Sequence, residues 1–230
     1  MADLNHPLRA SRAPSRGHRW RTGAAGSAAV ARTILLAAAL AAGLLAGCDR
    51  VASPSKPAFK AVDITGAEYA RELSLTDADG QRRTLADFKG KVTLVFFGYT
   101  QCPDVCPATM GELAAVKRDL GADGERVQGV FVSVDPQRDT PQVLKAYVGA
   151  FDPSFVGLRG TDEETKAAAR DFKVFFAQVP GKTEGSYTVD HTAGSYVFDT
   201  QGRVRLFVRY GSGAEALRHD LKLLLAEDPA

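Results

Sequence analysis

Cysteine is scarce in this sequence, with three residues in a chain of 230. Two of them, Cys102 and Cys106, stand four positions apart, and the third, Cys48, lies at the end of an N-terminal leader. If the chain is processed at Cys48, the folded protein carries only two free thiols. Their close spacing predicts one shared chemical site.

The leader has no apolar run long enough for a membrane-spanning helix. Its apolar stretch covers residues 34–46, about 13 residues, whereas a spanning helix needs about 20. Six arginines and one acid precede it, which is typical of a secretory signal. The segment LAGC at 45–48 resembles the lipobox of bacterial lipoproteins, which predicts cleavage before Cys48 and lipid attachment to it. An ordinary signal peptide with an incidental cysteine is the alternative.

These features predict a signal peptide at residues 1–47, a lipidated tether at 48–58 and one folded domain at 59–230. Residues 49–57 contain two prolines and two serines, which predicts a tether of intermediate stiffness. We expect the domain to be attached to a bacterial membrane on the periplasmic side.

The folded part has no excess of basic residues. The leader holds six arginines and one acid, which leaves 23 basic and 26 acidic residues and a net charge of −3. Nucleic-acid binding would require a basic surface on the folded part, so no nucleic-acid partner is expected.

Histidine is also rare, and only His191 and His219 follow the leader. His219 is flanked by charged residues in a predicted helix, which favours a solvated surface position. His191 follows a polar, glycine-containing segment at 181–185, where a flexible loop would let it approach the cysteines. A surface position and a metal-ligand role remain open for His191 from the residues alone.

The hydrophobic pattern predicts an α/β fold with a mixed sheet flanked by helices. Unbroken apolar runs at 92–97 and 127–134 predict buried strands, and the helical pattern at 107–120 makes them a parallel β-α-β unit. Further helices are expected at 140–151, 161–170 and 214–226, and further strands at 72–77, 156–158, 174–177, 194–198 and 204–210. The phenylalanines at 96, 97, 131, 175 and 176 are expected in the core.

The cysteine spacing favours a shared metal over a resting disulfide. Residues four apart on a helix have Cβ atoms about 5–6 Å apart, whereas a relaxed disulfide needs about 3.5–4.5 Å. Thiolates are soft ligands that select Cu(I), and two thiolates with an imidazole also hold Cu(II). A position near a helix N-terminus predicts lowered thiol pKa values, because the helix dipole favours the thiolate.

Four segments carry a family resemblance. DFKGK at 87–91, before a buried strand with cysteines at its end, is similar to the thioredoxin-like superfamily in its peroxiredoxin-related form. GYTQCPDVCP at 98–107, VSVDPQRDTP at 132–141 and VDHT at 189–192 together resemble the Sco/SenC family of copper-binding proteins. The match extends over nearly the whole predicted domain.

The resemblance implies a membrane-anchored, thioredoxin-like copper metallochaperone. Its ligands would be Cys102, Cys106 and His191, and its cargo Cu(I), Cu(II) or both. The family serves assembly of the dinuclear copper centre of cytochrome c oxidase. The implied partner is therefore the copper-bearing subunit of the oxidase or another copper chaperone.

Three other functions compete with this interpretation. A thiol:disulfide oxidoreductase would also use two cysteines, although the general redox motif of the fold is Cys-x-x-Cys. A peroxidase is disfavoured because Thr100 is only two residues before Cys102 and Val95 replaces the expected proline. A closed zinc site would need a fourth protein ligand.

Several neighbouring residues have two interpretations. Met110 offers a thioether but is expected to fill the core. Asp135 ends a central strand, where its carboxylate either tunes the thiols or orients a metal ligand, or simply forms an Asp-Pro turn. Arg138 and Asp139 are expected to be an exposed pair beside the next helix.

Overall fold

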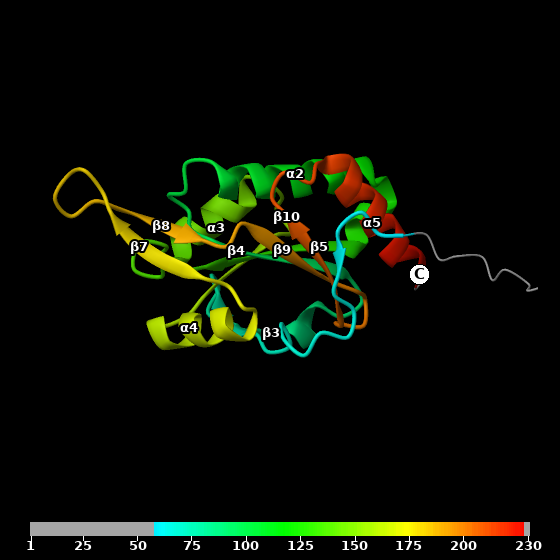
Figure 1. Cartoon of the computed structure of the whole chain (residues 1–230), viewed down its shortest axis with the longest axis horizontal. Coiled ribbons are helices and arrows are strands. Elements are labelled where there is room, and N and C mark those ends of the chain that lie inside the picture. Colours follow the sequence, from blue (N-terminus) through cyan, green and yellow to red (C-terminus); the bar gives the residue numbers. More distant parts are fainter. Residues whose placement is uncertain (1–57, 228–230) are drawn as a thin grey trace, which may run out of the picture. The chain divides into compact units, whose positions relative to one another are not determined.

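The computed structural model describes residues 58–227, in which helices cover both faces of an eight-stranded mixed sheet (Figure 1). The strand order in the sheet is β1-β10-β9-β4-β5-β6-β2-β3. Cys48, the predicted signal peptide and the tether up to residue 57 lie outside the described residues. No helix within residues 58–227 is both long and apolar enough to cross a membrane.

The strands are β1 (Val62–Asp63), β2 (Ser74–Asp77), β3 (Arg82–Thr84), β4 (Val92–Gly98), β5 (Val127–Ser133), β6 (Val156–Arg159), β7 (Phe176–Pro180), β8 (Tyr187–His191), β9 (Gly194–Phe198) and β10 (Val204–Arg209). The helices are α2 (Val105–Asp119), α3 (Pro141–Gly149), α4 (Asp162–Asp171) and α5 (Ala214–Glu227), with short 3-10 turns η1 (Leu85–Phe88) and η2 (Gly121–Arg126).

Strands β4 and β5 form the buried centre of the sheet. Every residue of both strands is buried, and the strands run parallel from the pair Val92–Val127 to the pair Gly98–Ser133. Burial on both faces explains why neither strand alternates polar and apolar residues. The predicted parallel β-α-β unit is confirmed, so the carboxyl ends of both strands meet at one edge of the sheet.

Aromatic side chains fill the layers on both sides of these strands. Phe96 and Phe131 have ring centroids 6.1 Å apart, and Phe131 lies 5.2 Å from Tyr147 of α3. The next residue of β4, Phe97, points to the opposite face, where its ring lies 5.1 Å from Phe172 at the end of α4. Figure 1 shows α4 on the side of the sheet opposite α2 and α5.

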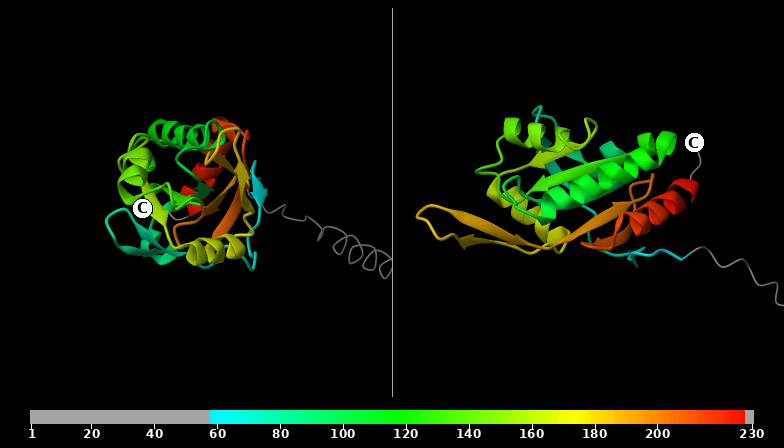
Figure 2. Two further views of the ribbon diagram at one scale, coloured as in Figure 1. Left: turned by 90° about the vertical axis from the view of Figure 1, so that its left-hand side faces the viewer. Right: turned by 90° about the horizontal axis from the view of Figure 1, so that it is seen from above.

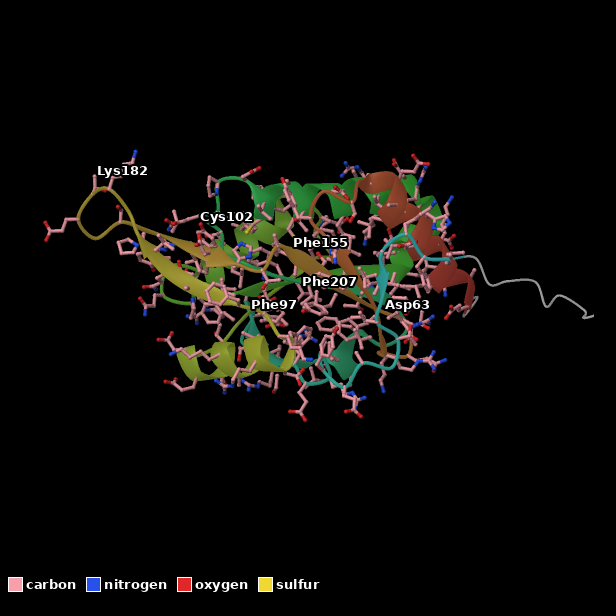
Figure 3. The ribbon with its side chains drawn as sticks, viewed as in Figure 1. Asp63, Phe97, Cys102, Phe155, Lys182 and Phe207 are labelled. Carbon is pink, nitrogen blue, oxygen red and sulfur yellow. The ribbon has the colours of Figure 1, made fainter. Side chains whose placement is uncertain are left out.

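Strands β7 and β8 form a separate ribbon that extends past the main sheet (Figures 1 and 2). They are antiparallel, with Phe176 opposite His191 and Pro180 opposite Tyr187. The polar segment at 181–185 is the tip of this ribbon, and Lys182 lies there (Figure 3). The sequence pattern predicted a strand at 174–177 but not its partner β8.

The prediction that Phe175 belongs to the core is wrong, because 65% of this residue is exposed. Phe176 is half-buried and packs against the core. Neighbouring residues of an extended chain point in opposite directions, so Phe175 faces solvent. The other four phenylalanines in that prediction do contact the core.

Helix α4 begins with a capping box, which gives a testable stability effect. The Thr161 hydroxyl accepts the Glu164 N–H at 3.2 Å, and the Glu164 carboxylate accepts the Thr161 N–H at 2.8 Å. We expect Thr161→Ala to lower the free energy of unfolding by about 1 kcal/mol, measured by urea denaturation. Thr161→Ser keeps the acceptor and serves as the control. An alanine variant as stable as the parent would contradict a role for this cap.

Candidate metal centre

Three side chains that could hold a metal ion meet at the edge where β4 ends. The sulfur atoms of Cys102 and Cys106 and a ring nitrogen of His191 all lie within 4.8 Å of one another. Cys106 Sγ is 3.3 Å from His191 Nε2. These are the residues that the sequence and the family resemblance singled out, and the fold brings all three together.

Each of these candidate ligands comes from a different local structure. Cys102 lies in the turn after β4, where its N–H donates to the Tyr99 carbonyl at 3.2 Å, and Cys106 lies in the first turn of α2. The two cysteines therefore do not lie on one helical face. The Cβ separation predicted from helical spacing assumed that they did. His191 is the last residue of β8 and not part of a loop. A paired strand, in which His191 lies opposite Phe176, therefore places the imidazole, and not the flexible loop that was expected.

Gly98 leaves the space that Cys106 occupies. A Cβ atom built on Gly98 would lie 2.7 Å from Cys106 Sγ and 2.9 Å from a ring carbon of Phe96. Both distances are shorter than real Cβ contacts allow. A glycine at the last position of β4 thus lets the thiol pack directly against the strand.

Burial dominates the electrostatics of the site. Cys106 is fully buried and Cys102 half-buried. Burial raises the pKa of the Cys106 thiol, so the expectation of a lowered pKa at the helix start is wrong for this residue in the metal-free protein. Burial also lowers the pKa of His191, which favours the neutral imidazole. A metal ion binding here must displace the Cys106 proton.

The surroundings of His191 orient its ring. Nδ1 lies 3.2 Å from the Thr192 carbonyl oxygen, and an N–H at this position can donate to it. That tautomer leaves the Nε2 lone pair directed at the cysteines. The rings of Phe96 and Tyr99 pack edge-on against the imidazole with centroids 5.8 and 6.0 Å away. The histidine is therefore held in an orientation suited to a metal ligand.

Asp139 is a residue whose importance the sequence did not reveal. It is fully buried, and its carboxylate accepts hydrogen bonds from the Thr100 hydroxyl and the Ser133 hydroxyl, both at 2.6 Å. Burial raises its pKa. The prediction of an exposed Arg138–Asp139 pair is wrong, because Asp139 is fully buried and Arg138 is half-buried. Asp139 instead hydrogen-bonds Thr100, two residues before Cys102. The signal available in the sequence was Ser133, a polar residue at the end of a largely apolar run.

Asp135 lies close to this turn and is also buried. Its carboxylate accepts the Tyr187 hydroxyl at 2.9 Å and pairs with the Arg138 guanidinium. Tyr187 begins β8, the strand that ends at His191. Asp135 therefore contacts the histidine-bearing strand and not a cysteine.

The remaining candidate ligands lie elsewhere. Met110 is fully buried in the hydrophobic core, as expected. His219 lies on α5 with its side chain 38% exposed, and its Nδ1 is 2.9 Å from an Asp220 carboxylate oxygen. Among residues 58–227, the group that could hold a metal consists only of Cys102, Cys106 and His191.

This donor set fits a soft metal. Two sulfurs and one imidazole nitrogen match the ligands that copper takes in proteins, and Cu(I) in particular favours thiolate. A closed zinc site has four protein ligands, and the described residues supply three at this position. Cys102 is only half-buried, so the site is open on its side.

Comparisons with known proteins agree with this geometry. Residues 62–226 match the family model described as SCO1/SenC. The SCO2-like protein of Rickettsia felis is 34% identical over 154 residues, which cover 66% of this chain and 75% of that protein.

Solved structures of relatives are similar as well. The copper-bound structure of Bradyrhizobium japonicum ScoI is 42% identical, with a TM-score of 0.62 over 69% of this chain and 100% of that chain. A SCO1/SenC family lipoprotein from Bacillus anthracis str. Ames is 27% identical, with a TM-score of 0.57 over 68% of this chain and 95% of that chain. The predicted thioredoxin-like fold is confirmed. Because the family model covers residues 62–226, most of the described domain, the chain belongs to the SCO1/SenC family.

Proposed function

We propose that this protein is a copper carrier that binds the ion through Cys102, Cys106 and His191. The observation that supports this most strongly is the meeting of the three donor atoms within 4.8 Å. A copper-bound relative with 42% identity adds to the case. The cysteines must be reduced to accept the ion, because the thiolate is the ligand.

Delivery of copper to another protein follows from the openness of the site. Cys102 is half-buried, so thiolates of an acceptor can approach the ion from that side. Copper then moves by ligand exchange, with one sulfur replacing another. The family resemblance points to assembly of the dinuclear copper centre of cytochrome c oxidase. Its copper-bearing subunit, or another copper chaperone, is the proposed partner.

The proposed location is the periplasmic side of a bacterial membrane, with a lipid on Cys48 as the anchor. The LAGC segment at 45–48 supports this, and the Bacillus anthracis relative is described as a lipoprotein. The tether between Cys48 and the folded domain would leave the copper site free to meet a partner.

A thiol:disulfide oxidoreductase is the second candidate, because the two sulfur atoms lie within 4.8 Å and both thiols are free. Such an enzyme would pass electrons from the cysteine pair to a disulfide and would not need His191. Activity that survives loss of His191 would favour it.

The role of the histidine can be tested with one substitution. We expect His191→Ala to weaken Cu(II) binding by at least about tenfold and to change its visible absorption, because the imidazole is lost. Cu(I), held by the two thiolates, should be affected less. Chelator competition and absorption spectroscopy measure both effects.

His219→Ala is the matched control for this experiment. His219 lies on α5, outside the group of metal-ligating residues. Its replacement should leave copper affinity and absorption unchanged. Equal spectra for His191→Ala and the parent protein would rule out His191 as a ligand.

A further inference from the structure

Arg138 occupies a central position between the two halves of the metal site. Its Nη1 donates to the Gln101 side-chain oxygen at 3.1 Å and to the Tyr187 carbonyl at 2.9 Å. Its Nε pairs with the Asp135 carboxylate. The guanidinium also stacks on the Tyr187 ring, 3.6 Å from the centroid. One side chain thus contacts the cysteine-bearing turn, the turn after β5 and the histidine-bearing strand.

The places of these contacts in the chain explain their importance. Gln101 immediately precedes Cys102, and Tyr187 begins the five-residue strand that His191 ends. Arg138 makes both contacts, and the next residue, Asp139, hydrogen-bonds Thr100 in the same cysteine-bearing turn. The turn at 135–139 therefore connects two segments that are far apart in the sequence.

Side-chain contacts attach the ribbon to the rest of the fold, because neither of its strands pairs with the main sheet. Strand β8 pairs with β7, and the described eight-stranded sheet contains neither of them. An isolated two-stranded ribbon is marginally stable in water. Before His191, β8 is attached through the Arg138 and Asp135 contacts of Tyr187, through packing of Tyr187 against the core, and through buried Val189, whose backbone hydrogen-bonds Tyr99. A ribbon of this kind opens more easily than the central strands.

Arg138 also has a feature that stability alone does not explain. Its Nη2 atom is buried, and no partner for it is present in the described part of the chain. A buried donor without a partner is unfavourable. The bonds that Nε and Nη1 make to three segments explain why an arginine lies here although its Nη2 donor is buried without a partner.

We propose that Arg138 is a positioning residue that holds the His191-bearing ribbon against the cysteine-bearing turn. This inference rests on the proposed copper-binding function. With Arg138 in place, the imidazole stays beside Cys106. Without it, the ribbon spends more time away from the cysteines and copper loses its third ligand.

Hydrogen exchange of the metal-free protein tests the positioning directly. We expect Arg138→Ala to accelerate exchange of the amides of β8 by about tenfold or more, with β4 and β5 unchanged. Arg82→Ala is the control, because Arg82 also joins separate segments, bonding the Ser74 hydroxyl and the Glu164 carboxylate, and none of these three residues belongs to the cysteine-bearing turn or to the β7–β8 ribbon. Equal β8 exchange in Arg138→Ala and Arg82→Ala would overturn the proposal.

A second variant covers the case in which Arg138→Ala fails to fold. Tyr187→Phe keeps the ring that stacks on Arg138 and removes only the hydroxyl that donates to Asp135. It should accelerate β8 exchange by a smaller factor. Arg138→Lys keeps the charge beside Asp135 but lacks the planar fork, so it should behave like the alanine variant. Full restoration by lysine would contradict the bridging role.

Copper binding supplies the link to His191. Arg138→Ala should weaken Cu(II) binding by at most the factor observed for His191→Ala. Adding Arg138→Ala to the His191→Ala variant should cause no further loss of affinity. Additive losses would show that Arg138 does not act through the histidine. Because hydrogen exchange uses metal-free protein, it judges the positioning role even if the copper function itself is disproved.

Discussion

Replacing Cys102 by serine is expected to lower copper affinity by more than about 100-fold. Loss of a residue that only hydrogen-bonds to a metal ligand typically costs about 10–100-fold, and loss of a ligand itself should cost more. The reason is chemical, because a serine hydroxyl is a hard, poorly ionised ligand and Cu(I) prefers thiolate. Cys102 lies in a turn and is half-buried, so serine fits without disturbing the core. Chelator competition with the reduced full chain measures the loss.

Met110→Leu is the matched control for the cysteine variant. Met110 is the other sulfur-containing residue close in sequence to the pair, and it is fully buried in the core. Leucine has a similar volume, so both fold and copper affinity should be retained. Copper retention in Cys102→Ser, or its loss in Met110→Leu, would contradict the proposed ligand set.

Gly98→Ala is expected to destabilise the protein by about 1–3 kcal/mol, the usual cost of inserting an atom into a packed core. The new methyl group would meet Cys106 Sγ at 2.7 Å and a Phe96 ring carbon at 2.9 Å. Relief requires movement of Cys106, a proposed copper ligand, or of the Phe96 ring. We therefore expect weaker copper binding together with the loss of stability in urea.

Gly111→Ala separates this effect from the general consequences of a glycine substitution. Gly111 lies inside α2, and the nearest atom to a new Cβ would be a Phe151 ring carbon at 4.0 Å. Alanine favours a helix over glycine by about 1 kcal/mol, so this variant should be more stable than the parent. A neutral Gly98→Ala variant would show that the strand end can adjust.

The centre of the fold follows from the sequence for a clear physical reason. Strands β4 and β5 are buried on both faces, so their residues are continuously apolar, and α2 between them has regular helical spacing. The cysteine-bearing turn follows from the same pattern. Its position after a parallel strand is what made Cys102 and Cys106 recognisable as a site.

The ribbon was harder to predict because its burial is uneven. Residues of β7 are half-buried or exposed, so the pattern shows neither a core strand nor a loop. Phe175 is apolar but exposed, which misled the core prediction. The pairing of β7 with β8 depends on tertiary contacts that no local pattern contains.

The polar support of the site was beyond local sequence reasoning for a related reason. Tyr187 and Asp135 are 52 positions apart, and Arg138 and Gln101 are 37 apart. Charged residues near a proline-containing turn are ordinarily exposed, whereas here burial of Asp139 is offset by hydrogen bonds from Thr100 and Ser133. Only the folded chain shows that these residues meet.

X-ray absorption at the copper edge tests the central claim most directly, because it identifies the atoms bound to the ion. The sample is the reduced full chain carrying Cys48→Ser, in which Cys102 and Cys106 are the only thiols, loaded with one copper per chain. We predict two sulfur ligands and one imidazole nitrogen, with the imidazole signal lost in His191→Ala. A copper site without sulfur, or with one sulfur only, would contradict the account.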